Sequence, residues 1–286
     1  MQEIAILLTT YNSKDYIEEQ VHSLKEQTYS HWKLYVRDDL STDNTPDMIA
    51  QMAVEDERIC VLHDTVKRGA LDGFMWLLAQ VEADYYLFCD HDDVWLPTKV
   101  EESLKLMQQA GAAEVPVIVC TDARVVDAQL NTIDDSFWHY RSSRPAMFRD
   151  KYFHLCYNNV LGCTMCFNRE ARRVALPYPP TAIMHDAWLA ATVLWHGGGI
   201  LPIERPLMLY RLHGDNTIGV GEVPSVASQL ARSSSLLKKV RRQYDASRPL
   251  TRMPFALFFL LKLKYMFFEH WYAIKISKNQ GNHYRL

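Results

Sequence analysis

Short hydrophobic runs alternate with amphipathic stretches over the first 110 residues of the chain. The hydrophobic runs have the length of strands and cover residues 4–9, 32–36, 59–62 and 85–89. The stretches between them place apolar side chains at helical spacing, and they cover residues 15–27, 46–54 and 71–81. This alternation predicts an α/β fold with a mostly parallel central sheet that is flanked by helices.

The pattern is less regular in the second half of the chain. Helical spacing recurs over 99–109 and 185–195, and strand-like runs cover 115–120, 161–167 and 200–210. The last of these runs is interrupted by Pro202 and Pro206. Residues 134–152 are aromatic and polar and predict no clear element. No internal repeat or low-complexity tract is present.

Three carboxylates follow the buried run at 85–89. They are Asp90, Asp92 and Asp93, with His91 among them, and a helix is expected to start after Pro97. Open α/β sheets bind ligands at the carboxyl ends of their strands. Clustered carboxylates repel one another and therefore favour a cation, a proton or a cationic partner. Carboxylate ligands completed by a phosphate suit Mg²⁺ or Mn²⁺, although a solvated loop before a capped helix is the simpler alternative.

The composition is that of a globular protein, and the charge is divided unevenly along the chain. Of 286 residues, 48% are hydrophobic and 23% charged, so a core can form. From Val223 onward, 12 Lys or Arg residues face two acids, which gives +10 against −13 for the preceding residues. This division argues against a nucleic-acid-binding body and indicates an anionic partner for the tail alone.

The sequence argues against a membrane-spanning or secreted protein, and against several classes of site and enzyme. No apolar run is long enough to cross a membrane, and the first residues lack the basic region of a signal peptide, so a cytoplasmic location is expected. Cys163 and Cys166 form a C-x-x-C pattern, which we interpret as buried thiols because no second ligand pair accompanies it. The phosphate loop, the dinucleotide fingerprint and the Gly-x-Ser-x-Gly elbow are all absent.

Acids at the ends of other predicted strands extend the candidate chemistry. Asp38 and Asp39 follow the second strand, where a carboxylate can accept hydrogen bonds from a nucleobase or a ribose hydroxyl. A metal on Asp92 could neutralise a diphosphate, and Asp186 could take a proton from a hydroxyl nucleophile. Asp186 also fits a purely structural role as an acid in the first turn of a helix.

Six segments carry a family resemblance in their order along the chain. They are Leu8-Thr-Thr-Tyr-Asn-Ser13, Arg37-Asp-Asp-Leu-Ser-Thr-Asp43, Asp90-His-Asp92, Asn159-Val-Leu-Gly-Cys-Thr-Met165, His185-Asp186-x-Trp188 and Tyr210-Arg-Leu-His213-x-x-Asn216. Each is weak alone, but the ordered set, which lies within residues 4–217, resembles the inverting family-2 glycosyltransferases with the A-type nucleotide-sugar-binding fold, and among them the rhamnosyltransferase-like members. Leu40 stands where the family has a Gly, and His91 stands where Gln is commoner, so its role is open.

The resemblance implies a role for each matching position. It places Thr9, Tyr11, Asp38 and Asp39 at the base and ribose, Gly69 and Asp90 close to the nucleotide, Asp92 with Asp90 and His213 at the metal, and Asp186 as the general base. His213 as an ordinary loop residue is the alternative. The implied cofactor is Mg²⁺ or Mn²⁺.

The implied reaction is a single inverting displacement. A sugar, with rhamnose favoured, would pass from a UDP- or dTDP-sugar to a hydroxyl of a growing, lipid-linked bacterial surface polysaccharide. Two alternatives stay open: a nucleotidyltransferase that makes nucleotide sugars, and a non-catalytic module that binds them. The expected domains are a catalytic domain at 1–222, with a nucleotide-binding half at about 1–112 and an acceptor-side half at about 113–222, and a basic helical tail at 223–286.

The tail has a pattern that suits a membrane surface. Residues 255–271 are rich in Phe and Leu, with Lys262 and Lys264 among them, and a basic cluster at 238–242 lies upstream. These features predict a helix that lies on the inner face of the cytoplasmic membrane. The alternative is an ordinary terminal helix that packs on the catalytic domain.

Overall fold

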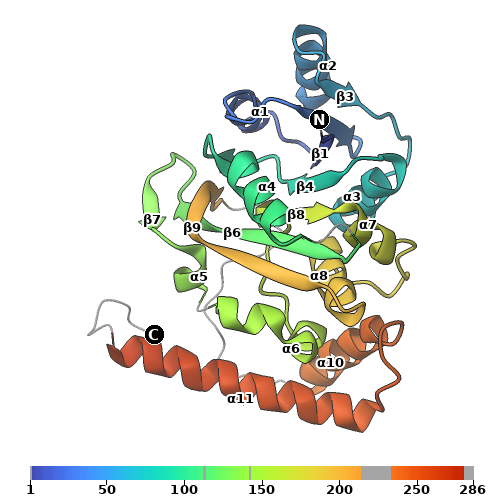
Figure 1. Ribbon diagram of the computed structural model, residues 1–286, viewed down its shortest axis with the longest axis vertical. Helices are drawn as coiled ribbons and strands as arrows, with labels where there is room; N and C mark the ends of the chain where they lie inside the picture. Colours follow the sequence, from blue (N-terminus) through green and yellow to red (C-terminus); the bar gives the residue numbers. More distant parts are fainter. Residues whose placement is uncertain (1, 112–113, 142, 214–232, 280–286) are drawn as a thin grey trace.

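The computed structural model describes residues 2–111, 114–141, 143–213 and 233–279, with side chains described except at 233–236 and 269–279. Asn216 and the predicted boundary between 222 and 223 lie outside these residues. Figure 1 shows a central sheet, with helices on its faces and two long helices beneath it.

A mixed, mostly parallel sheet forms the centre of the molecule. Its strands are β1 (Ile4–Thr10), β2 (Trp32–Asp38), β3 (Ile59–Val61), β4 (Tyr85–Cys89), β5 (Val94–Trp95), β6 (Val117–Val126), β7 (Thr132–Asp134), β8 (Met165–Asn168) and β9 (Gly199–Arg211). They lie in the order β3-β2-β1-β4-β8-β6-β9-β5, and β7 pairs with β6. Strands β1 to β4 are parallel, β8 runs antiparallel to both of its neighbours, and β5 runs antiparallel to β9. The predicted fold class is confirmed.

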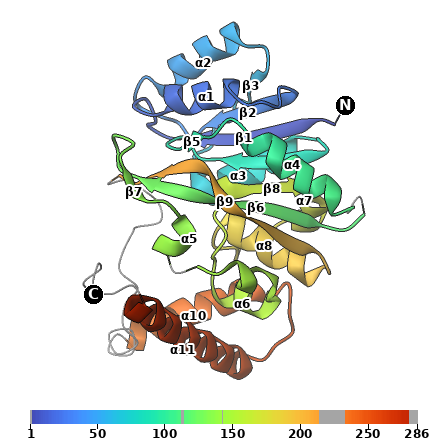
Figure 2. The same cartoon turned by 60° about the vertical axis from the view of Figure 1, so that its left-hand side comes forward.

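Helices cover both faces of this sheet (Figures 1 and 2). They are α1 (Ile17–Lys25), α2 (Thr45–Glu55), α3 (Gly69–Gln80), α4 (Lys99–Gln109), α5 (Phe137–Tyr140), α6 (Lys151–Cys156), α7 (Arg169–Ala175), α8 (His185–Trp195), α10 (Ser233–Ser247) and α11 (Phe255–Asn279). Short 3₁₀ turns cover Pro145–Arg149 and Gly162–Thr164.

Strand β4 shows how the two faces are built. Successive side chains of a strand point to opposite faces. The ring of Phe88 therefore meets Phe74 of α3 and His185 of α8, with centroids 5.2 and 4.8 Å away. The neighbouring Cys89 points to the other face, where Gln20 of α1 donates a hydrogen bond to its sulfur. All five residues of β4 are buried or nearly so, which agrees with the continuous apolar run in the sequence.

Two predicted strands differ in detail from the structure. The run at 200–210 forms one long strand despite its prolines, because Pro206 lies opposite Asp122, where the β6–β9 register shifts and the ladder is already irregular. The run at 161–167 begins as a 3₁₀ turn, and only Met165–Asn168 pairs as β8.

Helices α10 and α11 pack against α6 (Figure 2). Phe258 and Tyr265 of α11 are buried in an apolar cluster with Phe153. Lys262 is buried beside them: its Nζ donates to the carbonyl of Cys156 at 2.7 Å and lies 3.4 Å from the centre of the Tyr157 ring. The position of Lys262 on α11 therefore turns its side chain toward the domain, and away from any surface that the outer side of the helix contacts.

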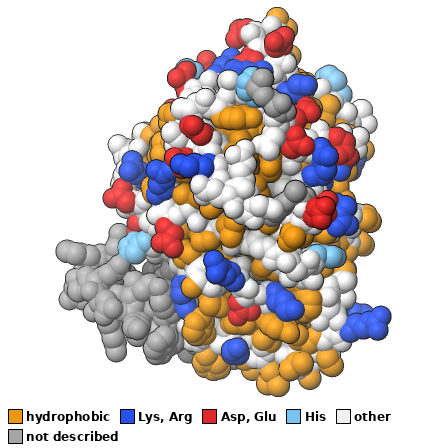
Figure 3. All heavy atoms as spheres, in the orientation of Figure 1, with side chains coloured by type: hydrophobic (Ala, Val, Ile, Leu, Met, Phe, Trp, Pro, Cys, Tyr) orange, Lys and Arg blue, Asp and Glu red, His pale blue; other side chains and the backbone are white. Residues whose placement is uncertain are grey.

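The opposite side of α11 is apolar and exposed. Leu257, Leu260, Phe267 and Phe268 are 53, 60, 56 and 38% exposed. Figure 3 shows hydrophobic side chains along the lower edge of the molecule, with Lys and Arg among them. Among the described residues, no helix has both the length and the apolar composition needed to span a bilayer. Helix α11 thus packs on the domain with one side and exposes apolar side chains on the other.

Candidate active site

A cleft of about 680 Å³ opens where β1 and β4 end. Eight of the nine residues predicted from the sequence line it: Thr9, Tyr11, Asp39, Gly69, Asp90, Asp92, Asp186 and His213. These residues come from the ends of separate strands and from the starts of α3 and α8, so the fold gathers the scattered motifs in one place.

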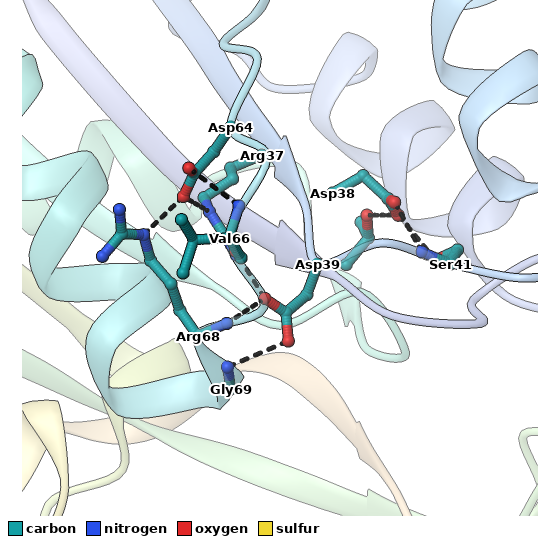
Figure 4. A network of polar contacts seen from close by, with 9 residues as sticks. Arg37, Asp38, Asp39, Ser41, Asp64, Val66, Arg68 and Gly69 are labelled. Carbon is teal, nitrogen blue, oxygen red and sulfur yellow. Dashed lines mark hydrogen bonds and ion pairs between the residues drawn. The ribbon is translucent and has the colours of Figure 1, made fainter.

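Asp39 braces the loop that leads into α3. Its carboxylate accepts hydrogen bonds from the backbone N–H of Arg68 at 2.7 Å and of Gly69 at 2.9 Å, and it pairs with the buried Arg37 at 2.8 Å (Figure 4). Burial raises the pKa of Asp39, but these hydrogen bonds and the Arg37 charge outweigh it and lower the pKa below its ordinary value. Gly69 has φ +70°, which an L side chain rarely adopts, and this explains the glycine at the start of the helix.

Asp38 points away from Asp39 and does not line the cleft (Figure 4). It accepts hydrogen bonds from Thr10 Oγ1 at 2.9 Å and from the backbone and hydroxyl of Ser41 at 2.7 and 2.6 Å. Asp38 therefore stabilises the turn between β2 and Ser41. Leu40 has φ +62°, a left-handed conformation that strains any residue with a Cβ and that a glycine would adopt without strain.

The acid loop after β4 concentrates negative charge. Burial and then the charges of Asp92 and Asp186 raise the pKa of Asp90 to about 7. Burial also raises the pKa of Asp92, but a 2.7 Å hydrogen bond with His213 Nε2 and the nearby His91 outweigh it and lower that pKa. His213 stacks on Tyr16 with ring centroids 4.9 Å apart, which fixes its position at the rim.

Arg211 holds this acid loop in place. Its side chain is 3% exposed, and its Nε donates to the backbone carbonyl of Asp92 at 2.7 Å. Its other guanidinium nitrogens donate to the carbonyl of Ala128 at 2.8 Å and to the carboxylate of Glu19. Its backbone N–H donates to Asp93 at 3.2 Å. The Tyr-Arg-x-His motif thus contains a residue that fixes the loop as well as one that faces the cleft.

Asp93, the third carboxylate of the acid loop, is buried and does not line the cleft. Asp90, Asp93 and Cys163 each bring a ligand atom to within 4.8 Å of the others. Burial raises the pKa of Asp93 and of the Cys163 thiol well above their ordinary values, which favours the protonated form of each. A thiol is also a poor ligand for Mg²⁺. Cys163 and Cys166 are buried and form no disulfide, as predicted.

Asp186 is held at the start of α8 and is 2% exposed. Its Oδ2 accepts the backbone N–H of Gly162 at 3.2 Å. A Cβ added at Gly162 would lie 2.5 Å from Nε2 of His185, so only glycine fits beneath this pair. The ring of His185 lies 4.2 Å from that of Phe74, and burial lowers the pKa of His185. It is therefore neutral at pH 7.

The structure adds cleft residues to which the sequence analysis gave no role. Lys67 brings its Nζ to 3.8 Å from the centre of the Tyr11 ring, and Tyr16, His185 and Tyr210 also line the cleft. His185 and Tyr210 belong to matched motifs, which could have indicated them. Lys67 follows a short strand and carries no such signal.

Comparisons with known proteins agree with this geometry. The sequence profile described as Glycosyl transferase family 2 matches residues 5–173. TuaG of Bacillus subtilis, assigned to teichuronic acid biosynthesis, is 32% identical over 65% of this chain and 71% of its own length. The dTDP-rhamnosyl transferase RfbG of Shigella flexneri is 25% identical over 74% of this chain and 73% of its own. WfaP of Escherichia coli, a UDP-Glc:α-D-GlcNAc-diphosphoundecaprenol β-1,3-glucosyltransferase, is 32% identical over 38% of this chain and 42% of its own.

Solved structures show the same fold. S. aureus TarS 1–349 in complex with UDP-GlcNAc has a TM-score of 0.64 at 14% identity, over 92% of this chain and 71% of that one. The mannosyltransferase PcManGT from Pyrobaculum calidifontis, in complex with GDP-Man and Mn²⁺, has a TM-score of 0.61 at 16% identity, over 99% of this chain and 76% of that one. Because the family profile covers more than half of the sequence, this chain belongs to glycosyl transferase family 2.

Proposed function

We propose that the protein is a metal-dependent inverting glycosyltransferase that moves a sugar from a nucleoside-diphosphate sugar to a hydroxyl of a bacterial surface polysaccharide. The observation that carries this proposal is the single cleft that contains both the acid loop at Asp90 and Asp92 and the acid at the start of α8, Asp186. A transferase needs a diphosphate site and a base within reach of the same sugar.

The nucleotide would lie against the ends of β1 and β2. Thr9 and Tyr11 line this part of the cleft, and Asp39 holds the backbone of Arg68 and Gly69 toward it. Tyr11 is 42% exposed, which leaves its ring free to stack on a base while Lys67 lies against it. Asp38 does not line the cleft, and it would contribute to the nucleotide site by holding the turn at Ser41 through hydrogen bonds.

The donor set at the acid loop fits a divalent cation. Asp90 and Asp92 offer carboxylate oxygens to the cleft, with the His213 imidazole beside Asp92. Burial, together with the charges of Asp92 and Asp186, raises the pKa of Asp90, and a bound cation would relieve this repulsion. When bound, Mg²⁺ or Mn²⁺ would neutralise the diphosphate leaving group. PcManGT, of the same fold, is in complex with Mn²⁺.

Asp186 would act as the general base. Its Oδ2 is oriented by the Gly162 N–H, and it lines the same cleft as the acid loop. A carboxylate placed in this way can take the proton of an acceptor hydroxyl as the hydroxyl attacks the sugar from the side opposite the diphosphate. The displacement inverts the anomeric centre.

Rhamnose from a dTDP-sugar is our proposed donor, and a lipid-linked glycan is the proposed acceptor. RfbG and WfaP, whose names specify such substrates, support the two assignments. We also propose that α11 rests on an anionic membrane surface through Leu257, Leu260 and Phe267, because exposed cations of α10 lie nearby. Residues 1–222 would then be the catalytic domain, and the remainder would include the membrane contact.

A panel of nucleotide sugars tests the reaction. Donor turnover should need Mn²⁺ or Mg²⁺, and Asp186→Asn should reduce it 10²–10⁴-fold while donor binding is kept. Asp47→Asn, which removes a first-turn acid from the remote helix α2, is the matched control. Near-normal turnover in Asp186→Asn would remove the base assignment. Release of pyrophosphate from a sugar phosphate and a nucleoside triphosphate would identify a nucleotidyltransferase instead.

Sedimentation with phosphatidylglycerol vesicles tests the membrane contact. Leu257→Ser/Leu260→Ser should release the protein from the vesicles. Val54→Ser, which changes an 88% exposed residue on α2, should not. Equal binding by all three proteins would contradict the assignment of α11.

A further inference from the structure

A groove with excess positive charge lies beside α10, outside the cleft. It has a volume of about 660 Å³, and one wall is the turn at 180–182. The other wall contains Lys238, Arg241, Arg242 and Asp245. Arg241 pairs with Asp245 at 3.2 Å, whereas no described residue forms an ion pair or hydrogen bond with Lys238 or Arg242. Two cations are therefore available to a ligand, on a chain that carries −13 before Val223.

The position of these cations follows from the helix. Residues 238, 241, 242 and 245 recur at the spacing that gathers side chains on one helical face. Val240 is buried against the domain and fixes the rotation of α10 about its axis. Lys239 is exposed but does not line the groove. The chain thus offers a neighbouring cation as a control for the groove.

A small chamber adjoins both the groove and the cleft. It has a volume of about 140 Å³, shares Ala182 with the groove and shares Met184 with the cleft. Trp188 and Gln243 are among its lining residues. The buried Oε1 of Gln243 accepts no hydrogen bond from the described residues, while its Nε2 donates to the carbonyl of Cys156 at 3.0 Å.

These features match the chemistry of a charged glycan. An aromatic face and an unpartnered amide oxygen suit a sugar ring with hydroxyl donors. Lys and Arg are the usual partners of phosphate. Ala182 and Asp186 are four positions apart in the chain, so the two lie within about 14 Å even if the chain is fully extended. A short glycan can therefore contact both the groove and Asp186.

We propose that the groove binds a phosphate or diphosphate group of the acceptor, and that the acceptor extends from there through the chamber to Asp186. The proposal rests on the proposed function, because it assigns the acceptor of that reaction. It gives α10 a role in acceptor recognition in addition to its packing on the domain. The groove lies apart from the acid loop and serves a different phosphate from that of the donor.

Acetylation of lysines, read by mass spectrometry, tests the groove without any turnover. Inorganic pyrophosphate should slow the acetylation of Lys238 at least five-fold and leave Lys239 unchanged. Lys67, in the cleft, reports pyrophosphate that binds at the nucleotide site. Arg242→Gln should abolish the protection of Lys238, and Lys239→Gln should preserve it. Protection of Lys67 alone, or of no lysine, would overturn the proposal even if the protein is a glycosyltransferase.

Vesicles distinguish the sources of the phosphate. Protection of Lys238 but not Lys239 by phosphatidylglycerol vesicles, with none by pyrophosphate, would assign the groove to the phosphate of a membrane lipid and overturn the proposal, whereas protection by pyrophosphate supports a phosphate of the acceptor. Equal protection of both lysines by vesicles, with none by pyrophosphate, would show that α10 merely faces the membrane and would overturn the proposal.

Discussion

Replacement of Gly162 by Ala should disturb the active site through a specific clash. The added Cβ would lie 2.5 Å from Nε2 of His185 and 3.5 Å from Cβ of Asp186. Ordinary contact begins at 3.4 Å, so the ring of His185 must retreat by about 0.9 Å. Phe74 and Phe88 pack against this ring, with centroids 4.2 and 4.8 Å away, and they oppose the shift.

The expected cost has two parts. Overpacking of this kind destabilises a protein by about 1–3 kcal/mol. The shift also moves Asp186, whose carboxylate accepts the Gly162 N–H, and a misplacement of about 1 Å at a catalytic group can cost roughly 10²-fold in rate. Denaturant unfolding measures the first part, and kcat for the transfer reaction measures the second.

A double-mutant cycle separates this clash from a general effect. His185→Ala removes the ring, so Gly162→Ala should cost at least about 1 kcal/mol less in the His185→Ala background than in the wild type. Gly199→Ala is the matched control, because an added Cβ there meets nothing within 4 Å. The reasoning would be refuted if Gly162→Ala were no more harmful than Gly199→Ala, or if the cycle showed no coupling.

Three further predictions concern the acid loop, the turn at Leu40 and a buried histidine. Asp92→Asn should abolish the Mn²⁺-dependent binding of UDP in calorimetry, and unchanged affinity would exclude Asp92 as a ligand. Leu40→Gly should be about 1 kcal/mol more stable than Leu40→Ala in urea unfolding, the reverse of the usual order, because a left-handed φ strains any residue with a Cβ. Burial lowers the pKa of His154 to about 4, so the unfolded chain binds this proton first as the pH falls. The free energy of unfolding should therefore fall by up to about 3 kcal/mol between pH 6.5 and 4, relative to His154→Phe, and a constant difference would contradict the assignment.

The layered architecture and most of the cleft residues could be predicted from the pattern and motifs of the sequence. The hydrophobic runs at 4–9 and 85–89 are buried on both sides, so their pattern predicts strands without knowledge of their neighbours. Because parallel strands end at the same edge, the acids after them were bound to meet there, and Asp90, Asp92 and Asp39 do line one cleft. The family motifs then placed Asp186 and His213 beside them.

The different roles of residues that are close in sequence depend on the folded structure and could not be predicted from the pattern. Asp38 and Asp39 are adjacent in sequence, yet one shapes a turn and the other faces the cleft, because side chains alternate in direction at the end of a strand. Lys262 and Lys264 lie two positions apart on α11, and the helical rotation buries the first and exposes the second. Arg211 supports the acid loop from 119 residues away, through contacts that no local pattern can encode, because only the packed sheet brings the end of β9 to the end of β4.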